Sequence, residues 1–175
     1  MDSYFTISLA LGVSIDSFVV GRHINHRIFT ALFLVSFSHF LFFLSGLYTG
    51  EFFYKLVGPF MNWLAFIIFL YLTYDALKNF FHESKIILID NIKKIILITI
   101  PLSIDAFAVS ASSKSLINDP ILGLILVSIF APFFCFLGYK TTHRLAKSSH
   151  RSIYFAETIF FAGLAISVLS KHILN

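Results

Sequence analysis

Apolar residues fill six long blocks of this chain, and short polar segments separate one block from the next. A helix needs about 20 mostly apolar residues to cross the hydrocarbon core of a bilayer. Each block is close to that length, so the pattern predicts an all-α integral membrane protein with six transmembrane helices in a single membrane domain, residues 1–175. The expected spans are about residues 3–20, 28–50, 56–81, 92–113, 119–139 and 153–171.

The composition agrees with a membrane location and excludes several other classes of protein. Apolar residues make up 58% of the chain and charged residues 13%, whereas soluble domains have about 45–50% and about 25%. The formal charge of +4 lies in short loops, where it predicts membrane topology and not a nucleic-acid-binding surface. The pattern G-x-x-x-x-G-K-[ST] does not occur, so ATP hydrolysis within this chain cannot drive its function.

The distribution of basic residues predicts the orientation. The segments after spans one, three and five hold ten Lys and Arg residues, whereas the opposite side holds three. Because Lys and Arg accumulate in cytoplasmic loops, we expect the first set to be cytoplasmic and both termini to lie outside. The ten are Arg22, Arg27, Lys78, Lys85, Lys93, Lys94, Lys140, Arg144, Lys147 and Arg151, and the three are Lys55, Lys114 and Lys171.

Two seven-residue stretches nearly repeat, Ser14–Val20 (SIDSFVV) and Ser103–Val109 (SIDAFAV), at an offset of 89 positions. A weaker match relates Phe42–Gly46 to Phe134–Gly138 at an offset of 92. Because each half has three helices, an odd number, the second half enters the membrane from the opposite side. The sequence therefore predicts two inverted three-helix repeats, as in many secondary transporters. Repeat 1 covers about residues 1–81, a cytoplasmic connector about 82–94, and repeat 2 about 92–175.

Asp16 and Asp105 lie inside apolar spans, where each costs about 2.5–3.5 kcal/mol on insertion scales. One interpretation is that each carboxylate bonds a neighbouring serine or backbone group and holds helices together. Their repeat-related positions favour function instead. Gly12 and Pro101 each lie one turn earlier, so we expect both helices to bend or open there, leaving carbonyl oxygens beside a carboxylate. Such oxygen-rich pockets suit hard or borderline cations.

Three further polar residues are candidates for the same metal site. His39, near the middle of the second span, is either a metal ligand or proton carrier, or a hydrogen-bonded packing residue. Asp75 lies near the cytoplasmic end of span three, and Glu157 lies about one turn inside span six. These two acids either relay ions toward the cytoplasm or reach the interface and pair with Lys78 or Arg151.

The doubled motif resembles a known family. The segments Gly12–Val20 and Ser103–Ser110 are similar to the paired Ser-Met-Asp-Ala-Phe-Ala-Val-Ser signature of the MntP-type manganese efflux pump family. These are small six-helix proteins of the bacterial inner (plasma) membrane, within the lysine-exporter-like transporter superfamily. The likeness covers the whole chain in length, span count and outside–outside topology. It implies that Asp16 and Asp105 are the paired substrate-site acids and that manganese is transported, with the same multi-pass location.

The chain also departs from this family pattern. Ile15 and Ile104 stand where the motif usually has Met, a change that conserves volume. His39 stands where the family often has an acid, and Asp75 where some members have a basic residue. We expect the acids at 75 and 157 to compensate for the acid absent at 39.

We therefore expect a secondary-active exporter of a divalent cation, and not an enzyme. Asp16 and Asp105, one from each half, bind the cation near the midplane, and the halves rock to expose it to either side. Burial favours the neutral form of a carboxyl group and a bound cation favours the charged form, so one site can exchange protons for metal. The prediction is proton antiport. The expected partners are the cation and the bilayer, with no cofactor and no nucleic acid; a monomer and a homodimer are both compatible with the sequence.

Other functions stay open at this point. An intramembrane aspartyl protease also uses two buried Asp residues that share a proton. Tyr74-Asp75 offers half of such a signature, but no Gly-x-Gly-Asp occurs. A non-transporting membrane scaffold is a second alternative. Within transport, the rivals are export of another metal or of a cationic amino acid.

Overall fold

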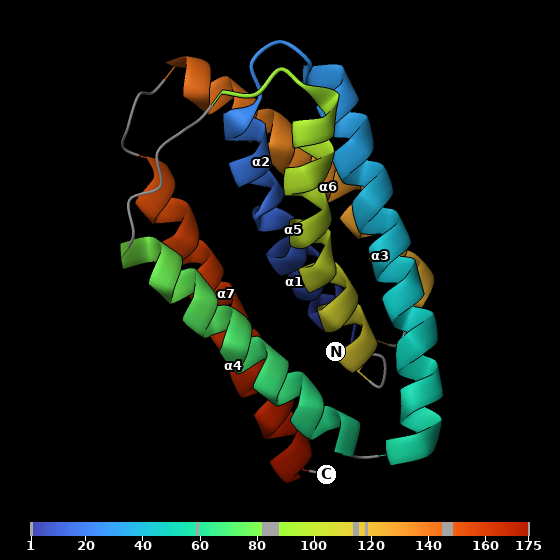
Figure 1. Cartoon of the computed structure of the whole chain (residues 1–175). Coiled ribbons are helices and arrows are strands. Elements are labelled where there is room, and N and C mark those ends of the chain that lie inside the picture. Colours follow the sequence, from blue (N-terminus) through green and yellow to red (C-terminus); the bar gives the residue numbers. More distant parts are fainter. Residues whose placement is uncertain are drawn as a thin grey trace.

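The computed structural model describes residues 2–58, 60–81, 88–113, 116–117, 119–144 and 149–174, with side chains for 4–58, 60–81, 88–113, 116–117, 119–141 and 154–170. The regular elements among these residues are helices, and Figure 1 shows their arrangement. They are α1 (Asp2–Ile15), α2 (Ser17–His23), α3 (Ile28–Val57), α4 (Phe60–Phe81), α5 (Ile92–Ser112), α6 (Pro120–Arg144) and α7 (Ser149–Leu174).

The helices match the six predicted spans. The helices α1 and α2 together give the apolar segment Tyr4–His23, and α3 to α6 each contain a segment long and apolar enough to cross a membrane. The helix α7 contributes the shorter apolar stretch Tyr154–Ser170. The prediction of an all-helical membrane chain is confirmed for the described residues; of the six predicted spans, five are long and apolar enough to cross a membrane and the sixth, in α7, is shorter. The first part of the predicted connector, residues 82–87, lies outside the described residues.

Two boundaries differ from the expected ones. The first polar segment begins later, because α2 continues to His23 and buries the Arg22 side chain completely, so Arg22 is not a loop charge. The helix α3 continues to Val57, and its last two turns carry an ion pair of 3.4 Å between Lys55 Nζ and Glu51 Oε1. A helix of 30 residues is about 45 Å long, so its ends extend beyond a hydrocarbon core of about 30 Å.

Each helix packs mainly against a helix from the other half of the chain. The helix α3 lies along α5, α6 lies along α1 and α2, and α4 lies along α7. In Figure 1 the α4–α7 pair runs obliquely beside the other helices. The third helix of one half therefore pairs with the third helix of the other, and each second helix pairs with the opposite first helix.

Glycines set the closest helix contacts. A Cβ atom at Gly46 of α3 would overlap the carbonyl oxygen of Phe107 in α5, and one at Gly138 of α6 would overlap the carbonyl oxygen of Phe18 in α2. Hydrocarbon tails are as apolar as leucine, so helices in a membrane associate through close van der Waals packing, which small residues permit. These two glycines let backbone meet backbone.

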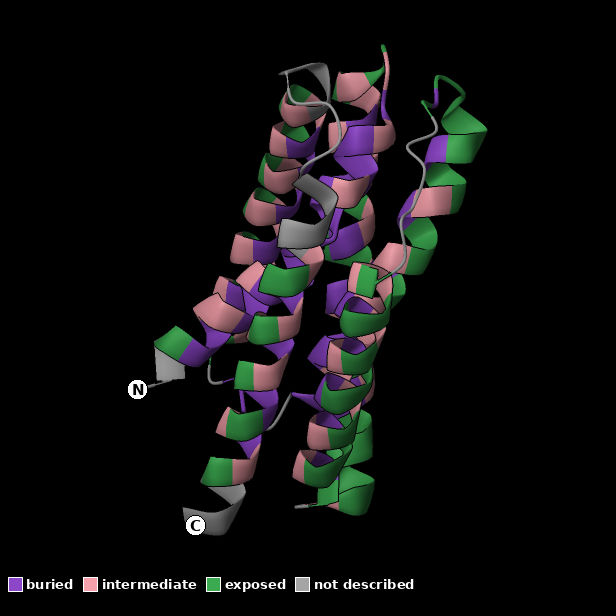
Figure 2. Ribbon diagram, turned by 90° about the vertical axis from the view of Figure 1, so that its left-hand side faces the viewer, coloured by how far each residue is buried: buried purple, intermediate pink, exposed green. Residues whose placement is uncertain are grey.

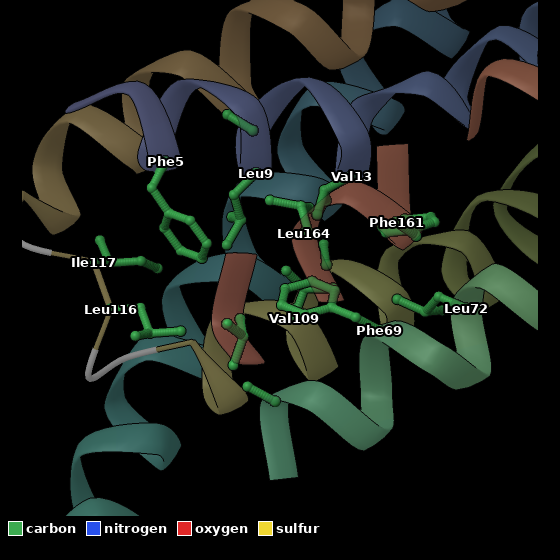
Figure 3. Packing of buried hydrophobic residues seen from close by; sticks show 14 of the residues in the cluster. Phe5, Leu9, Val13, Phe69, Leu72, Val109, Leu116, Ile117, Phe161 and Leu164 are labelled. Carbon is green, nitrogen blue, oxygen red and sulfur yellow. The ribbon is translucent and has the colours of Figure 1, made fainter. Parts of the chain in front are cut away.

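Two buried hydrophobic clusters lie on either side of a polar layer. The large cluster joins α1 and α3 to α4, α5, α6 and α7, and Figure 3 shows its side chains converging, whereas the small cluster joins α2, α3, α5 and α6. Figure 2 shows that exposed residues lie on the outward faces of the helices. Many of these exposed residues are large and apolar, which suits a lipid surrounding. Between the clusters lies the polar layer of buried Ser14, Asp16, Ser17, His39, Thr99 and Ser103.

Candidate cation site

The first membrane span is interrupted at Asp16. The helix α1 ends at Ile15 and α2 begins at Ser17, while the Val19 N–H donates to the Asp16 carbonyl over 2.9 Å. Asp16 keeps helical angles (φ −61°, ψ −24°), so the chain continues in the same direction. The expected opening near Gly12 is therefore not found there but one turn later.

The second motif behaves differently. The helix α5 continues through Pro101 without interruption, so the expected opening is not seen there. Proline has no N–H to donate, and the packing of α5 along α3 holds the helix in one piece. The irregular backbone therefore lies at the carboxylate of one motif only.

Four acids from four spans act on one another electrostatically. The carboxylate of Asp16 is repelled by the charges of Glu157 and Asp105, and the carboxylate of Asp105 is repelled by the charge of Asp75. Glu157 in turn senses Asp105 and Asp75. The structure thus brings together the two motif acids and both of the other predicted acids, from α5, α4, α7 and the α1–α2 junction. Like charges gathered in a buried place repel, so a cation among them is stabilised.

Two of these acids are buried with an oxygen left unsatisfied. Asp16 is 6% exposed and Glu157 is 8% exposed. Asp16 Oδ1, Glu157 Oε2 and the neighbouring Ser14 Oγ have no hydrogen-bond partner within the described part of the chain. Buried polar atoms are nearly always paired, and leaving one unpaired costs about 1–3 kcal/mol. Orphaned oxygens of this kind are what a bound cation or proton would satisfy.

Asp75 and Glu157 differ in how far they are buried and in their partners. Asp75 is half-buried and accepts a hydrogen bond of 3.1 Å from Asn79 Nδ2. The alternative partner predicted for Glu157, Arg151, has a side chain outside the described residues. Glu157 is buried, and its carboxylate lies within electrostatic range of Asp105 and Asp75.

His39 lies in the polar layer and is hydrogen-bonded on both ring nitrogens. Nδ1 lies 3.0 Å from the Val35 carbonyl oxygen and 3.3 Å from Ser103 Oγ, and Nε2 lies 3.3 Å from Ser17 Oγ. These hydrogen bonds agree with one of the two interpretations of His39, and a role as metal ligand or proton carrier stays a prediction. Sequence reasoning identified the two serines only as small residues near the acids; their positions within the doubled motif were the available signal.

The acids and the histidine do not form a closed metal cage in this conformation. Among the described residues, no three His, Cys, Asp or Glu side chains are close enough together to hold one metal ion. A cation at the acids would therefore take other oxygen atoms as well, from serine or from the backbone.

A family model described as "Mntp: Putative manganese efflux pump" matches residues 22–169. The chain belongs to this family. The matched range contains His39, Asp75, Asp105 and Glu157 and begins six positions after Asp16. No curated protein and no solved structure matched the chain. The family is one of transporters, so manganese is a transported substrate and not a cofactor. Together with the long apolar helices, membership of this family indicates a multi-pass membrane protein.

Proposed function

We propose that this protein exports manganese, or a closely similar divalent cation, by secondary-active transport, with Asp16 and Asp105 at the cation site. The observation that carries the proposal is the meeting of four acids from four spans, two of them with orphaned buried oxygens. Acids inside a membrane are costly and mark ion pathways. Asp75 and Glu157 extend the same site.

The ligand chemistry supports manganese over softer metals. Carboxylate, carbonyl and hydroxyl oxygens suit manganese and magnesium, whereas copper and zinc favour imidazole and thiolate. The described acids offer oxygen, Ser14 adds an unpaired hydroxyl, and Cys135 is buried in the small cluster instead. Two ionised Asp residues neutralise one divalent ion.

Reciprocal packing supports the inverted repeat. Gly46 packs on Phe107 as Gly138 packs on Phe18, and both pairs join positions that the two sequence offsets relate. A pseudo-two-fold relation between the halves would map the α3–α5 pair onto the pairing of α6 with α1 and α2, and would place α4 against α7, which agrees with the observed contacts. In this mechanism repeat 1 and repeat 2 rock against each other around the acids, which opens the site to one side at a time.

The driving force is the proton gradient. When the cation leaves, the clustered carboxylates repel one another and take up protons, and the next cation displaces those protons. With Arg22 buried in α2, nine of the predicted basic residues stand against three, a distribution that supports both termini outside a bacterial inner membrane, so the cation moves outward as protons enter.

The test replaces each motif acid by its neutral isostere. Asp16→Asn and Asp105→Asn keep shape and remove charge, so manganese transport by reconstituted protein should fall to the level of empty vesicles. Asp119→Asn is the matched control: Asp119 is exposed before α6 and accepts from Leu122 N–H at 3.0 Å, a capping role that Asn performs equally well. Manganese uptake into inside-out vesicles and the accompanying proton release are measured together.

Transport that survives in either motif variant would contradict the proposal. Vesicles loaded with lysine test the cationic amino-acid alternative, and transport without proton movement would overturn antiport alone. Loss of transport in Asp119→Asn as well would show that the readout reports folding and not the site.

A further inference from the structure

His39 contacts both copies of the repeated motif. It lies on α3, is fully buried, and touches Ser17, the residue after Asp16, and Ser103, two residues before Asp105. Both serines are also fully buried. One imidazole ring therefore connects the two spans that carry the motif acids.

The hydrogen-bond geometry fixes what each ring nitrogen does. A carbonyl oxygen only accepts, so the contact of 3.0 Å with the Val35 oxygen places the hydrogen on Nδ1. In the neutral ring Nε2 then carries the lone pair, and the Ser17 hydroxyl donates to it over 3.3 Å. Ser103 Oγ, at 3.3 Å from Nδ1, donates onward to Ser38 Oγ at 2.9 Å or to the Thr99 carbonyl at 3.0 Å. Both nitrogens are occupied.

The second half of the chain has no equivalent of this ring. His39 lies seven positions before Gly46, and the residue seven positions before Gly138 is Ala131. Ser14 is the repeat counterpart of Ser103, and its Oγ has no partner within the described residues. Where the sequence supplies alanine in place of histidine, the motif serine is left unsatisfied, so the bridge is made once and is asymmetric.

We propose that His39 is a positioning residue: as a neutral ring it ties Ser17 to Ser103 and so sets how far apart Asp16 and Asp105 are held, without itself binding the cation. This inference rests on the proposed function of the two acids. The ring's lone pair is already used by Ser17, and its N–H by Val35 and Ser103, so no free nitrogen faces the acids.

The test separates hydrogen bonding from metal binding and proton transfer. His39→Ala removes both contacts, whereas His39→Gln keeps an amide that can accept from Ser17. We expect His39→Ala to raise the KM for manganese about tenfold, and His39→Gln to return it to within about twofold of wild type. Ser17→Ala and Ser103→Ala should each raise KM about threefold. Ser45→Ala is the matched control, because Ser45 is exposed on the same helix and bonds only its own helix, at the Phe42 carbonyl.

Two readouts distinguish this role from the others. If His39 is a positioning residue, its loss should raise the KM for manganese, cobalt and cadmium by similar factors, because the spacing of the acids changes for all three. If His39 is a metal ligand, its loss should raise the KM for cobalt and cadmium most. The pH profile of transport should be the same in His39→Gln and wild type, whereas loss of a proton carrier would shift it. Each variant is first checked for a monodisperse elution profile, and the serine variants carry the test if His39→Ala does not fold.

The outcomes are separable. If His39→Gln is as impaired as His39→Ala, or if its pH profile shifts, the positioning role is overturned. An unchanged KM in His39→Ala, alongside an inactive Asp105→Asn, overturns this inference alone. Normal transport by Asp105→Asn overturns the proposed function and this inference with it.

Discussion

Asp90 joins the segment before α5 to the loop after α2. Its carboxylate accepts from Asn25 Nδ2 at 3.2 Å and from the His26 backbone N–H at 3.1 Å. Beside it the backbone forms a single parallel bridge between Ile24 and Ile89, with the Ile89 N–H donating to the His23 carbonyl at 2.7 Å. The contact therefore connects the ends of the two spans that carry the motif acids, outside the membrane.

The stability of this contact should depend on pH. The Asn25 hydrogen bond, then the His26 N–H and the nearby positive charge of His26 and Arg27, lower the pKa of Asp90 below its ordinary value of 3.8. A pKa that is lower in the folded state means that the stabilisation is complete above that ordinary value and disappears as the pH falls through the lowered pKa. The melting temperature of Asp90→Asn should therefore fall less than that of wild type when the pH is lowered from 6 to 3.

The control for this prediction is Asn25→Ala, which removes the strongest of these influences and should bring the acid-induced loss to a higher pH. Melting of the solubilised protein, followed by circular dichroism at each pH, gives the comparison. An equal loss of melting temperature in Asp90→Asn and wild type would show that Asp90 contributes nothing to acid sensitivity.

At the same scale, the sequence singled out candidate residues but did not indicate their contacts. Asp16 and Asp105 were found because the same uncommon residue recurs in the same local motif, and the structure brings them within electrostatic range. The partners of Asp90 and His39 were not predictable. The side-chain partners of His39 lie 22 and 64 positions away in the chain and those of Asp90 lie 64 and 65 away, and no local pattern encodes a contact at such separations.

At the scale of single helices, glycine decides which faces meet. On α3, Gly46 and Gly50 lie one turn apart, and a Cβ at Gly50 would overlap the Ala111 carbonyl oxygen just as one at Gly46 overlaps that of Phe107. This is the spacing that lets two membrane helices approach closely. The same face of α3 carries His39, so the glycines also bring the imidazole within reach of α5.

Substitution of an interface glycine should separate the helices. In Gly138→Ala the new methyl group meets the Phe18 carbonyl oxygen and neither backbone can move without cost, so we expect a loss of about 1–3 kcal/mol and a melting temperature lower by several degrees. Gly163→Ala is the matched control on α7. No atom lies within 4 Å of a Cβ there, because Gly163 lines an apolar groove of about 520 Å³ between α1 and α7.

In that control, alanine should leave stability unchanged or raise it by up to about 1 kcal/mol, through its better helix propensity. Thermal melting of both variants in the same detergent tests the pair. Equal effects of Gly138→Ala and Gly163→Ala would mean that close packing of α6 on α2 does not limit stability.

Helix positions were predictable and helix interruptions were not. Apolar length alone located the spans, because the bilayer demands about 20 such residues whatever the neighbours are. The break lies at Asp16 and α5 continues through Pro101, contrary to the local expectation. Packing against a neighbouring helix can hold a proline-containing helix straight, and that neighbour is not visible in local sequence.

At the scale of the whole molecule, the segments after α2 and before α5 meet at the upper end of the bundle in Figure 1; Arg27 lies in the first of them, and Lys93 and Lys94 follow the second. The start of α1 and the end of α7 lie toward the lower end. This arrangement agrees with an even number of spans. Which end of the bundle faces the cytoplasm is then predicted by the positive charges of the loops.

Labelling at the two ends of α3 tests that direction. In a Cys135→Ala background, Arg27→Cys precedes α3 and Lys55→Cys lies in its last turn; both positions are exposed. We expect an impermeant maleimide added to intact cells to label position 55 and not position 27, because position 27 belongs to the set of basic residues predicted to be cytoplasmic. Labelling of position 27 alone would reverse the orientation, and both sites should react once the membrane is permeabilised.

The sequence by itself determined the class of protein, the spans and the two acids, because membrane insertion depends on local apolar length and on charges that each residue carries alone. Only the tertiary structure decided that α3 lies on α5, that α4 lies on α7, and that His39 bonds both motifs. Those contacts depend on which helix faces meet. Helix association in lipid is decided by close fit between distant segments and not by hydrophobicity, which every face here shares.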